Sequence, residues 1–386
     1  MTEWIECTLD KLGEIVGGAT PSTKCEDYYG GSIPWITPKD LSSFKGRYIT
    51  SGERNITEKG LASCSAQMMP KDAVLFTSRA PIGYVAIASQ SVCTNQGFKS
   101  IVVNDKADPL FVYYLLKYNK DAIEAMGSGT TFKEVSGKTM RAVKVRIPLD
   151  VSYQKRIAAV LDSLDTKIEN SERINDNLQQ QAAALFSSLY DRTNTEVRFT
   201  DLIQILGGGT PKTGENTYWN GNIAFFTPKD VGTPYTLSTE KTITEEGLSH
   251  CNSRLYPVNT VFVTARGTVG KVGMSGVPMA MNQSCYALVG KETHQLLVYF
   301  YTLKTVDRLK HKASGAVFDA ITTRDFESEQ IMKLSDEDAK SFLCIAAPMF
   351  QKVLDNGIEN QRLSTLRDSL LPKLMSGEID VSAVQL

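Results

Sequence analysis

The chain repeats itself, and this internal repeat limits its possible folds more than any other feature of its 386 residues. The segment GATPSTKCEDYYGGSIPWITPKD begins at Gly18, and the related segment GGTPKTGENTYWNGNIAFFTPKD begins at Gly208. Further matches continue along both halves: ITEKGL at Ile56 with ITEEGL at Ile243, Cys64 with Cys251, Arg79 with Arg266, and Asn95-Gln96 with Asn282-Gln283. Matches this dense favour one structural unit of about 190 residues, used twice, over two unrelated domains with similar loops.

Each copy divides into a mixed domain and a long helical region. In the first copy, short β-rich runs at Ala73–Thr77, Val85–Ala88 and Lys99–Val103 are separated by glycine, proline and asparagine turns, and a helical stretch follows from Pro109. We therefore predict an α+β fold, with mixed domains over residues 1–150 and 192–335 and helical regions over residues 151–191 and 336–386.

The two helical regions share an apolar seam. From Ser152 to about Tyr190, apolar residues recur every three or four positions, with no interior proline or glycine. The region from about Asp336 to Ser376 has the same spacing, but Pro348, Gly357 and Pro372 predict a kinked or interrupted helix. Such a seam needs a partner, and the obvious partner is the other copy. This predicts a pseudo-twofold molecule, in which two mixed α/β domains are separated by two long antiparallel, coiled-coil-like helices of about 60 Å.

Composition excludes several classes of protein. The 42 lysines and arginines against 43 aspartates and glutamates give a formal charge of -1, which argues against a polyanion binder driven by a basic tail. The longest apolar run, Phe342 to Phe350, is too short to span a bilayer, and the first residues, MTEWIECTLDK, do not resemble a signal peptide. Seven cysteines without a CxxC pair and three histidines without zinc-ligand spacing predict a cytoplasmic protein with reduced thiols. We expect no metal, no cofactor and no membrane contact.

The order of domains and several motifs together resemble one known family, the specificity (S) subunits of type I restriction–modification systems. The motifs are VFVTARGTVG, MNQSC, GSGTTFKEVSGKTM, QKRIAAVLDSLDTKIEN and LRDSLLPKLMSGEIDV. The resemblance extends from Trp4 to Val381. It departs before the long helices, where the common Pro-Pro motif followed by Glu-Gln is reduced to IPLDVSYQK at Ile147 and to MKLSDEDAK in the second copy. We interpret this difference as sequence drift.

The resemblance implies a non-catalytic subunit of a larger methyltransferase and endonuclease complex. Residues 1–150 and 192–335 would be target-recognition domains 1 and 2, each binding one half of a bipartite, asymmetric site in double-stranded DNA. Residues 151–191 and 336–386 would be the central and C-terminal conserved helical regions, which set the half-site spacing and dock two methyltransferase subunits. Restriction subunits would join this core. Helices of about 60 Å, at about 3.4 Å per base pair, limit the distance between half-site centres to about 17 base pairs.

Local charge favours DNA binding independently of the resemblance. The segment before the first long helix has five basic residues and one acidic residue, Glu134. The basic residues are Lys133, Lys138, Arg141, Lys144 and Arg146. In the second copy, those that face only Asp307 are Lys304, Arg308, Lys310 and Lys312. Such patches suit phosphate contacts, which orient a protein on DNA without reading its sequence. For each single residue, a solvated charged surface is the alternative.

The repeat also separates shared residues from those that could discriminate between half-sites. If the two domains read different sequences, residues identical at matched positions cannot discriminate, and the divergent segments must do so. The shared candidates, expected to be scaffold or sequence-neutral contacts, are Lys39 and Lys229, Arg79 and Arg266, and Asn95-Gln96 and Asn282-Gln283. For Pro38 and Asp40 of the TPKD segment, strand-exit or helix-cap chemistry is the alternative.

The divergent segments are Ser42–Asn55 and Ser128–Lys138 in the first copy and Val231–Thr242 and Ser314–Arg324 in the second. Arginine and lysine suit guanine edges, and asparagine or glutamine suits adenine. The DNA-binding residues predicted in these segments, together with Lys212, are Lys45, Arg47, Ser128, Thr130, Thr131, Lys133, Lys138, Tyr235, Ser314 and Arg324.

Two other functions stay open at this point. A stand-alone nuclease needs clustered carboxylates for Mg²⁺, and a methyltransferase needs a glycine-rich cofactor loop with an Asn/Asp-Pro-Pro-aromatic motif; the sequence has neither pattern. The segment Ser136–Thr139 resembles the end of a phosphate-binding loop, but Phe132 stands where that loop requires glycine. A general interaction scaffold with a coiled-coil spacer, unrelated to DNA, is the second alternative.

Overall fold

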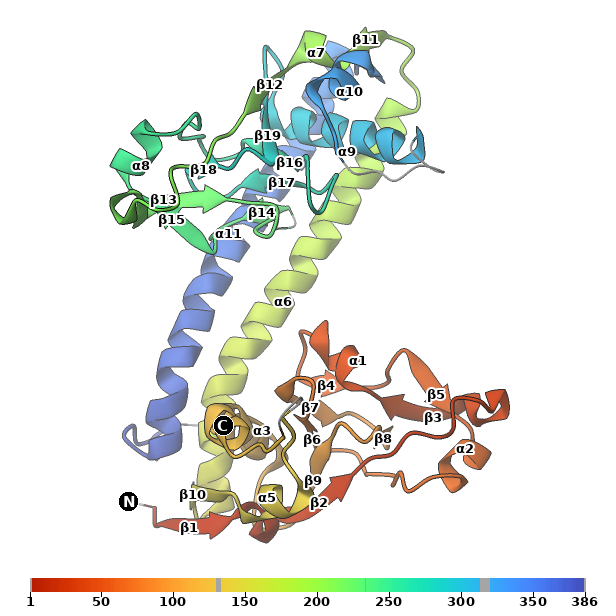
Figure 1. Ribbon diagram of the computed structural model, residues 1–386, viewed down its shortest axis with the longest axis vertical. Coiled ribbons are helices and arrows are strands. Elements are labelled where there is room, and N and C mark those ends of the chain that lie inside the picture. Colours follow the sequence, from red (N-terminus) through yellow and green to blue (C-terminus); the bar gives the residue numbers. More distant parts are fainter. Residues whose placement is uncertain (1, 130–132, 233, 313–319, 385–386) are drawn as a thin grey trace. The chain divides into compact units, whose positions relative to one another are not determined.

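The computed structural model of the chain describes residues 2–129, 133–232, 234–312 and 320–384. The chain forms two compact units: unit 1 comprises Met1–Glu169 with Arg362–Leu386, and unit 2 comprises Asn170–Gln361. Two long helices, α6 (Val151–Tyr190) and α11 (Asp336–Ser376), contribute residues to both units (Figure 1).

Unit 1 contains three sheets. A five-stranded sheet has the order β2-β9-β6-β7-β4, a three-stranded sheet has the order β5-β3-β8, and β1 pairs with β10. The strands are β1 (Trp4–Thr8), β2 (Gly13–Gly17), β3 (Tyr29–Ile36), β4 (Tyr48–Ile49), β5 (Arg54–Ile56), β6 (Val74–Ser78), β7 (Ile82–Ala88), β8 (Cys93–Thr94), β9 (Lys99–Val103) and β10 (Lys144–Pro148). The three predicted β-rich runs correspond to β6, β7 and β9, which confirms them.

Helices pack against both the five-stranded and the three-stranded sheet of unit 1. They are the 3-10 turns η1 (Leu9–Lys11) and η2 (Glu26–Tyr28) and the helices α1 (Pro38–Ser42), α2 (Glu58–Ala62), α3 (Pro109–Tyr118), α4 (Lys120–Ala125) and α5 (Gly137–Ala142). Helix α3 begins at Pro109 because the Asp108 carboxylate caps it, accepting from the Phe111 amide at 2.9 Å. The predicted helical stretch is split at Asn119, whose side-chain amide donates to the Leu115 carbonyl at 2.8 Å and closes α3.

Unit 2 repeats the strand orders of unit 1 position by position. Its sheets are β12-β19-β16-β17-β14, β15-β13-β18 and β11-β20. The strands are β11 (Glu196–Arg198), β12 (Ile203–Gly207), β13 (Trp219–Phe226), β14 (Tyr235–Thr236), β15 (Lys241–Ile243), β16 (Val261–Thr264), β17 (Val272–Ser275), β18 (Met279–Met281), β19 (Cys285–Gly290) and β20 (Gln330–Met332). This identity of topology confirms the internal repeat and the α+β class.

The helices of unit 2 differ from those of unit 1 in several places. They are α7 (Phe199–Leu202), η3 (Asn216–Tyr218), α8 (Glu245–Ser249), α9 (Gln295–Lys312) and α10 (Thr323–Ser328). Helix α9 takes the place of both α3 and α4. The position that matches Asn119 is Thr305, which is buried and has no side-chain amide to close the helix. The helix therefore continues through it.

Of the predicted kinked or interrupted helix, the interruption is wrong, because α11 is a single helix from Asp336 to Ser376. Pro348 and Pro372 lie on its exposed side, where water can bond to the carbonyl groups that lose their helical donors. At Gly357 an added Cβ would lie 2.9 Å from the Leu237 Cδ1 atom. The small residue therefore lets the loop after β14 approach the helix closely.

The two long helices contact each other within each unit. In unit 1, the Arg367 guanidinium lies 2.6 Å from the Asp165 carboxylate. In unit 2, the Asn356 side-chain amide donates to the Asn175 side-chain oxygen at 2.8 Å. Residue numbers fall along α11 as they rise along α6, which is the pattern of antiparallel helices.

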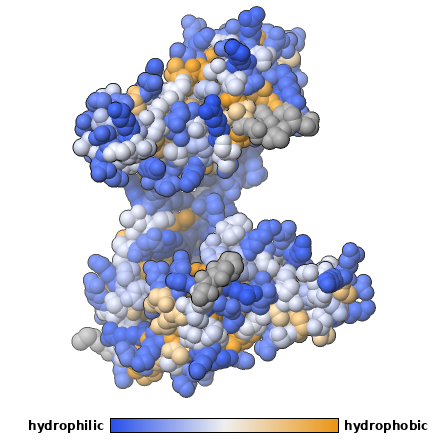
Figure 2. All heavy atoms as spheres, viewed as in Figure 1, coloured by the Kyte–Doolittle hydropathy of each residue, from blue (hydrophilic) through white to orange (hydrophobic). Residues whose placement is uncertain are grey.

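Within the described ranges, no helix is long and apolar enough to cross a membrane. The face drawn in Figure 2 is mainly hydrophilic, with small separate hydrophobic patches.

Candidate nucleic-acid interface

Four loops of unit 1 meet at one end of the parallel pair β3 and β8. The Asn95 amide donates to the Ile36 carbonyl at 3.0 Å, and the Ala19 amide donates to the Thr94 carbonyl at 3.0 Å. The Ser78 amide donates to the Gly97 carbonyl at 2.7 Å. These bonds bring together residues 18–20, 37–40, 78–80 and 94–97, so the shared candidate residues of the first copy lie in neighbouring loops.

In each TPKD segment the half-buried aspartate accepts hydrogen bonds from the neighbouring backbone and threonine. Asp40 Oδ2 accepts from the Thr37 amide at 2.7 Å and from the Thr37 hydroxyl at 2.6 Å, while Oδ1 accepts from the Glu53 amide at 2.8 Å. Asp230 makes the same three bonds in unit 2, to Thr227 and to the Glu240 amide. The aspartate caps helix α1 in unit 1, which confirms the helix-cap interpretation of Asp40, and it makes the same bonds in a turn of unit 2.

The lysine of each TPKD segment points outward. Lys39 forms an ion pair with Glu53 at 2.7 Å, and Lys229 forms the matching pair with Glu240 at 3.9 Å. The lysine side chains are 79% and 82% exposed. The hydrogen bond with Glu53 raises the pKa of Lys39 and lowers that of Glu53. Exposed pairs of this kind are weak, so a phosphate can compete for either lysine.

The shared asparagine and glutamine residues divide into a structural and an exposed member. Asn95 Oδ1 accepts from the Gly97 amide at 2.8 Å, and Asn282 Oδ1 accepts from the Ser284 amide at 3.0 Å, so both asparagines shape their loops. Gln96 and Gln283 are exposed. Their side-chain oxygens accept hydrogen bonds from the hydroxyl groups of Thr20 and Thr210. The glutamines are thus held in matching positions at the surface of each unit.

The shared arginines have different surroundings. Arg79 pairs through its backbone with Glu134, and its guanidinium lies 3.6 Å from that carboxylate, which also lies 3.7 Å from Lys99. Arg266 makes the matching backbone pairing with Ala320, so the carboxylate is missing there. Arg266 is exposed, and among the described residues no ion pair holds it. The second copy therefore offers a freer cation at this position.

Several of the predicted divergent residues lie at the surface. Those with exposed side chains are Lys45, Ser128, Lys133, Lys138, Lys212 and Arg324. Thr130, Thr131 and Ser314 lie outside the described residues. Surface position is compatible with DNA contact, and the assignment of these residues to DNA stays a prediction.

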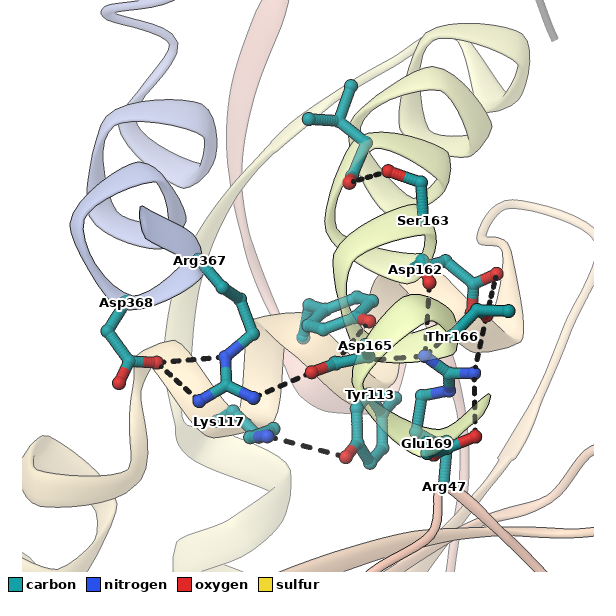
Figure 3. A network of polar contacts seen from close by, with 12 residues as sticks. Arg47, Tyr113, Lys117, Asp162, Ser163, Asp165, Thr166, Glu169, Arg367 and Asp368 are labelled. Carbon is teal, nitrogen blue, oxygen red and sulfur yellow. Dashed lines mark hydrogen bonds and ion pairs between the residues drawn. The ribbon is translucent and has the colours of Figure 1, made fainter. Parts of the chain in front are cut away.

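Arg47, a predicted reading residue, is instead buried against helix α6. The Arg47 side chain is 6% exposed and forms ion pairs with three acidic residues of α6, at 3.3 Å from Asp162, 3.9 Å from Asp165 and 3.2 Å from Glu169 (Figure 3). In this arrangement its guanidinium is not available to a base edge. We therefore remove Arg47 from the DNA-binding set, because the sequence could not reveal which helix face its loop covers.

Tyr235, a predicted reading residue of unit 2, is half-buried and likewise contacts a long helix. Its hydroxyl donates to Asn259 Oδ1 at 2.9 Å, and its ring packs against Phe350 of α11 with centroids 6.5 Å apart. Burial raises the pKa of this tyrosine, and nearby Tyr299 raises it further. Tyr235 is thus also removed from the DNA-binding set.

The basic residues of the two predicted patches, which include Arg308 and Lys312 of α9, have more partners than the sequence suggested. Arg308 lies 3.6 Å from Glu329, and Lys312 pairs with the same carboxylate, which is 1% exposed. The expectation that these cations face only Asp307 is therefore wrong, because Glu329 is distant in sequence. In unit 1, Arg146 stacks over the Trp4 ring at 5.3 Å and donates to the Ser376 carbonyl at 3.1 Å.

A metal centre has no counterpart in the part of the chain that the structure describes, where no group of three or more histidine, cysteine, aspartate or glutamate side chains could hold an ion. The candidate interface is a surface of exposed cations and amides, carried by equivalent loops in two units. It can bind a polyanion and present hydrogen-bonding groups to it.

The family model described as the type I restriction modification DNA specificity domain matches residues 1–180 and 192–335. The chain belongs to this family. Its members are the specificity subunits, the non-catalytic components of type I restriction–modification complexes, so a stand-alone DNA-acting enzyme is set aside.

Individual relatives agree with this assignment. The type I restriction enzyme MjaIX specificity subunit of Methanocaldococcus jannaschii is 31% identical over 408 residues, which cover 98% of this chain and 94% of that protein. The HindI specificity subunit of Haemophilus influenzae is 23% identical over 369 residues, covering 73% and 80%. The crystal structure of the type I S subunit from M. genitalium covers 97% of this chain and 96% of that one, with a TM-score of 0.64 and 17% identity, which shows a shared fold.

Proposed function

We propose that this specificity subunit directs a type I restriction–modification complex to a bipartite, asymmetric site in double-stranded DNA. Domain 1 (residues 1–150) binds one half of the site and domain 2 (residues 192–335) binds the other. The family implies assembly with DNA and with the other subunits of the complex. We assign to this chain two methyltransferase subunits as direct partners, with restriction subunits joining that core.

One observation carries the proposal: equivalent loops present the same exposed groups in both units, while the segments around them differ. Lys39 and Gln96 in unit 1 match Lys229 and Gln283 in unit 2, and all four side chains are exposed. Identical groups suit the phosphates, which are the same in every half-site. The divergent exposed residues, among them Lys45, Lys138 and Arg324, are our candidates for base contacts.

We further propose that the helical regions 151–191 and 336–386 act as the spacer. The 40 residues of α6 correspond to about 60 Å at about 1.5 Å per residue. Two domains that read different half-sites give a target with unread base pairs between its halves. Half-site centres then lie at most about 17 base pairs apart.

The start of α11 is our candidate for one methyltransferase contact. A hollow of about 1000 Å³ lies there in unit 2, with an apolar floor that includes Leu297 and Leu343 and with Lys333 and Lys340 among its polar residues. Near the start of α6 in unit 1, the buried Gln154 side chain donates to the Pro148 carbonyl at 2.9 Å. A Leu343→Arg variant should retain less methyltransferase than a Lys352→Ala variant, which changes an exposed residue further along α11.

The direct test combines a pull-down with methylome sequencing. The tagged chain, co-expressed with a type I methyltransferase subunit, should retain two copies of it, and the host genome should carry methyl groups at a split, asymmetric sequence. A continuous palindrome would contradict the spacer model. Retention of no methyltransferase subunit, together with no DNA preference, would favour the remaining alternative of a scaffold unrelated to DNA.

A further inference from the structure

We propose that Arg47 is a positioning residue, which fixes recognition domain 1 on helix α6 and thereby sets the half-site spacing that the complex accepts. The inference rests on the function proposed above and assigns to that function a residue that does not touch DNA. It follows from the contacts of the Arg47 side chain, from their geometry and from the absence of an equivalent in unit 2.

The Arg47 side chain donates hydrogen bonds to one face of α6 over two helical turns. Its Nη1 atom donates to the Asp162 carbonyl at 3.2 Å, and Nη2 donates to the Thr166 hydroxyl at 2.8 Å and to Glu169 at 3.2 Å (Figure 3). Residues 162, 166 and 169 follow the spacing of a single helix face. Because the guanidinium is a rigid planar fork, these bonds fix the rotation and the height of the loop on the helix.

Asp165 extends this attachment to two further elements. Its Oδ2 atom accepts from the Tyr114 hydroxyl of α3 at 2.7 Å, and its Oδ1 atom lies 2.6 Å from Arg367 of α11. The Asp165 side chain is 9% exposed. One carboxylate therefore joins the recognition domain to both long helices. In such a buried network a small displacement of any member leaves a charge unpaired, which favours a single arrangement.

The backbone of the sheet takes the same course in unit 2, where the residue that matches Arg47 is a proline. Arg47 immediately precedes β4, and its carbonyl accepts from the Ile87 amide at 2.7 Å. The matching residue before β14 is Pro234, whose carbonyl accepts from the Met274 amide, also at 2.7 Å. The backbone is thus the same in both units, while the charged side chain is present in one. We infer that Arg47 serves the placement of domain 1 and not the formation of its sheet.

The test measures spacing preference with the full chain assembled with methyltransferase subunits. Duplexes carry the two half-sites with the unread spacer at its natural length or changed by one base pair in either direction. The variants are Arg47→Lys, which keeps the charge without the fork, and Arg47→Met. Lys71→Met, a change at an exposed lysine of the same unit outside the predicted DNA-binding set, is the matched control. If Arg47→Met does not fold, Glu169→Gln removes one contact of the fork and takes its place.

For each variant we compare the methylation rate on the natural spacer with the rate on an altered spacer, and we expect this ratio to fall about tenfold in the Arg47 variants. The physical reason is that a misplacement of about 1 Å can change a rate on the order of 100-fold. The base preferences within each half-site should persist, and Lys71→Met should keep the wild-type ratio. Loss of methylation by the same factor on every spacer would overturn the inference, since it indicates structural support alone. An inability of the wild-type complex to methylate any split site would contradict the proposed function itself.

Discussion

Units 1 and 2 have the same strand orders, but their matching edge strands, β4 and β14, contact a long helix by different chemistry. We call these contacts the charged joint of unit 1 and the aromatic joint of unit 2. In unit 1, a buried arginine before β4 meets three carboxylates of α6. In unit 2, Tyr235 of β14 packs its ring on Phe350 of α11 and donates one hydrogen bond to Asn259. The helices themselves are joined by Asp165 and Arg367 in unit 1 and by Asn175 and Asn356 in unit 2.

This difference teaches that the repeat preserves the backbone and leaves the joint between domain and helix free to change. A charged joint accepts few geometries, because each buried charge must keep its partner. An aromatic joint tolerates small shifts, since dispersion contacts have no strict direction. Each domain can therefore be placed on its helix separately from the other.

The largest expected effect comes from breaking the charged joint. Arg47→Met leaves three neighbouring carboxylates without their buried cation, so we expect the free energy of unfolding of unit 1 to fall by about 3–5 kcal/mol. Amide hydrogen exchange should accelerate along residues 152–169 of α6. Lys45→Met should leave both quantities unchanged, and an equal response to both substitutions would contradict the network.

A second variant makes unit 2 resemble unit 1. Glu329 is 1% exposed, and the matching residue of unit 1 is the buried Val143. Glu329→Val replaces a buried carboxylate by an apolar side chain, while Arg308 and Lys312, which are 42% and 61% exposed, stay solvated; stability should therefore rise by about 1–2 kcal/mol or stay unchanged. The substitution also frees Arg308 and Lys312, so binding to non-specific DNA should tighten and depend more steeply on salt. Weaker binding in a salt titration would count against a phosphate role for these cations.

The aromatic joint should respond less than the charged one. Tyr235→Phe keeps the ring on Phe350 and removes the hydrogen bond to Asn259, which predicts a loss of about 1 kcal/mol in the stability of unit 2. Denaturant unfolding monitored by hydrogen exchange in β14 would measure it. A loss as large as that of Arg47→Met would show that the two joints are not different in kind.

The smallest effect concerns the C-terminal segment of unit 1. Asp380 accepts from the Ser382 hydroxyl at 2.6 Å and from the Tyr153 hydroxyl at 2.9 Å, and these bonds lower its pKa. A lowered pKa in the folded state means that the contribution of Asp380 is present above its ordinary pKa and is lost as the pH falls through the lowered value. Asp380→Asn at neutral pH should therefore speed exchange of the Val381 amide, which donates to Tyr153, whereas Glu378→Gln should not.

Much of the fold was predictable from the sequence because the repeat and the apolar spacing are local patterns. The periodicity of α6 and α11 gave their extents, while the uninterrupted course of α11 through Pro348 depends on which side of the helix faces water. The two errors at Arg47 and Tyr235 have one cause. Divergence between copies marks positions that can change, and these include joints as well as reading surfaces.

The partners of the cations were beyond sequence reasoning for a related reason. Glu329 lies 17 positions after Lys312, and only the turn of the chain through α10 brings its carboxylate to α9. By contrast, the roles of Thr37 and Asp40 were predictable, because a capping box is a short-range pattern in which both partners lie three residues apart.

The central claim is that each copy reads its own half of the target, and replacement of one domain by the other tests it most directly. A chain in which residues 192–335 are replaced by residues 1–150 is assembled with methyltransferase subunits, and the methylated sites in the host genome are sequenced. The account predicts an inverted repeat of the half-site read by domain 1, separated by unread base pairs. Methylation that stays at the original asymmetric site would contradict it.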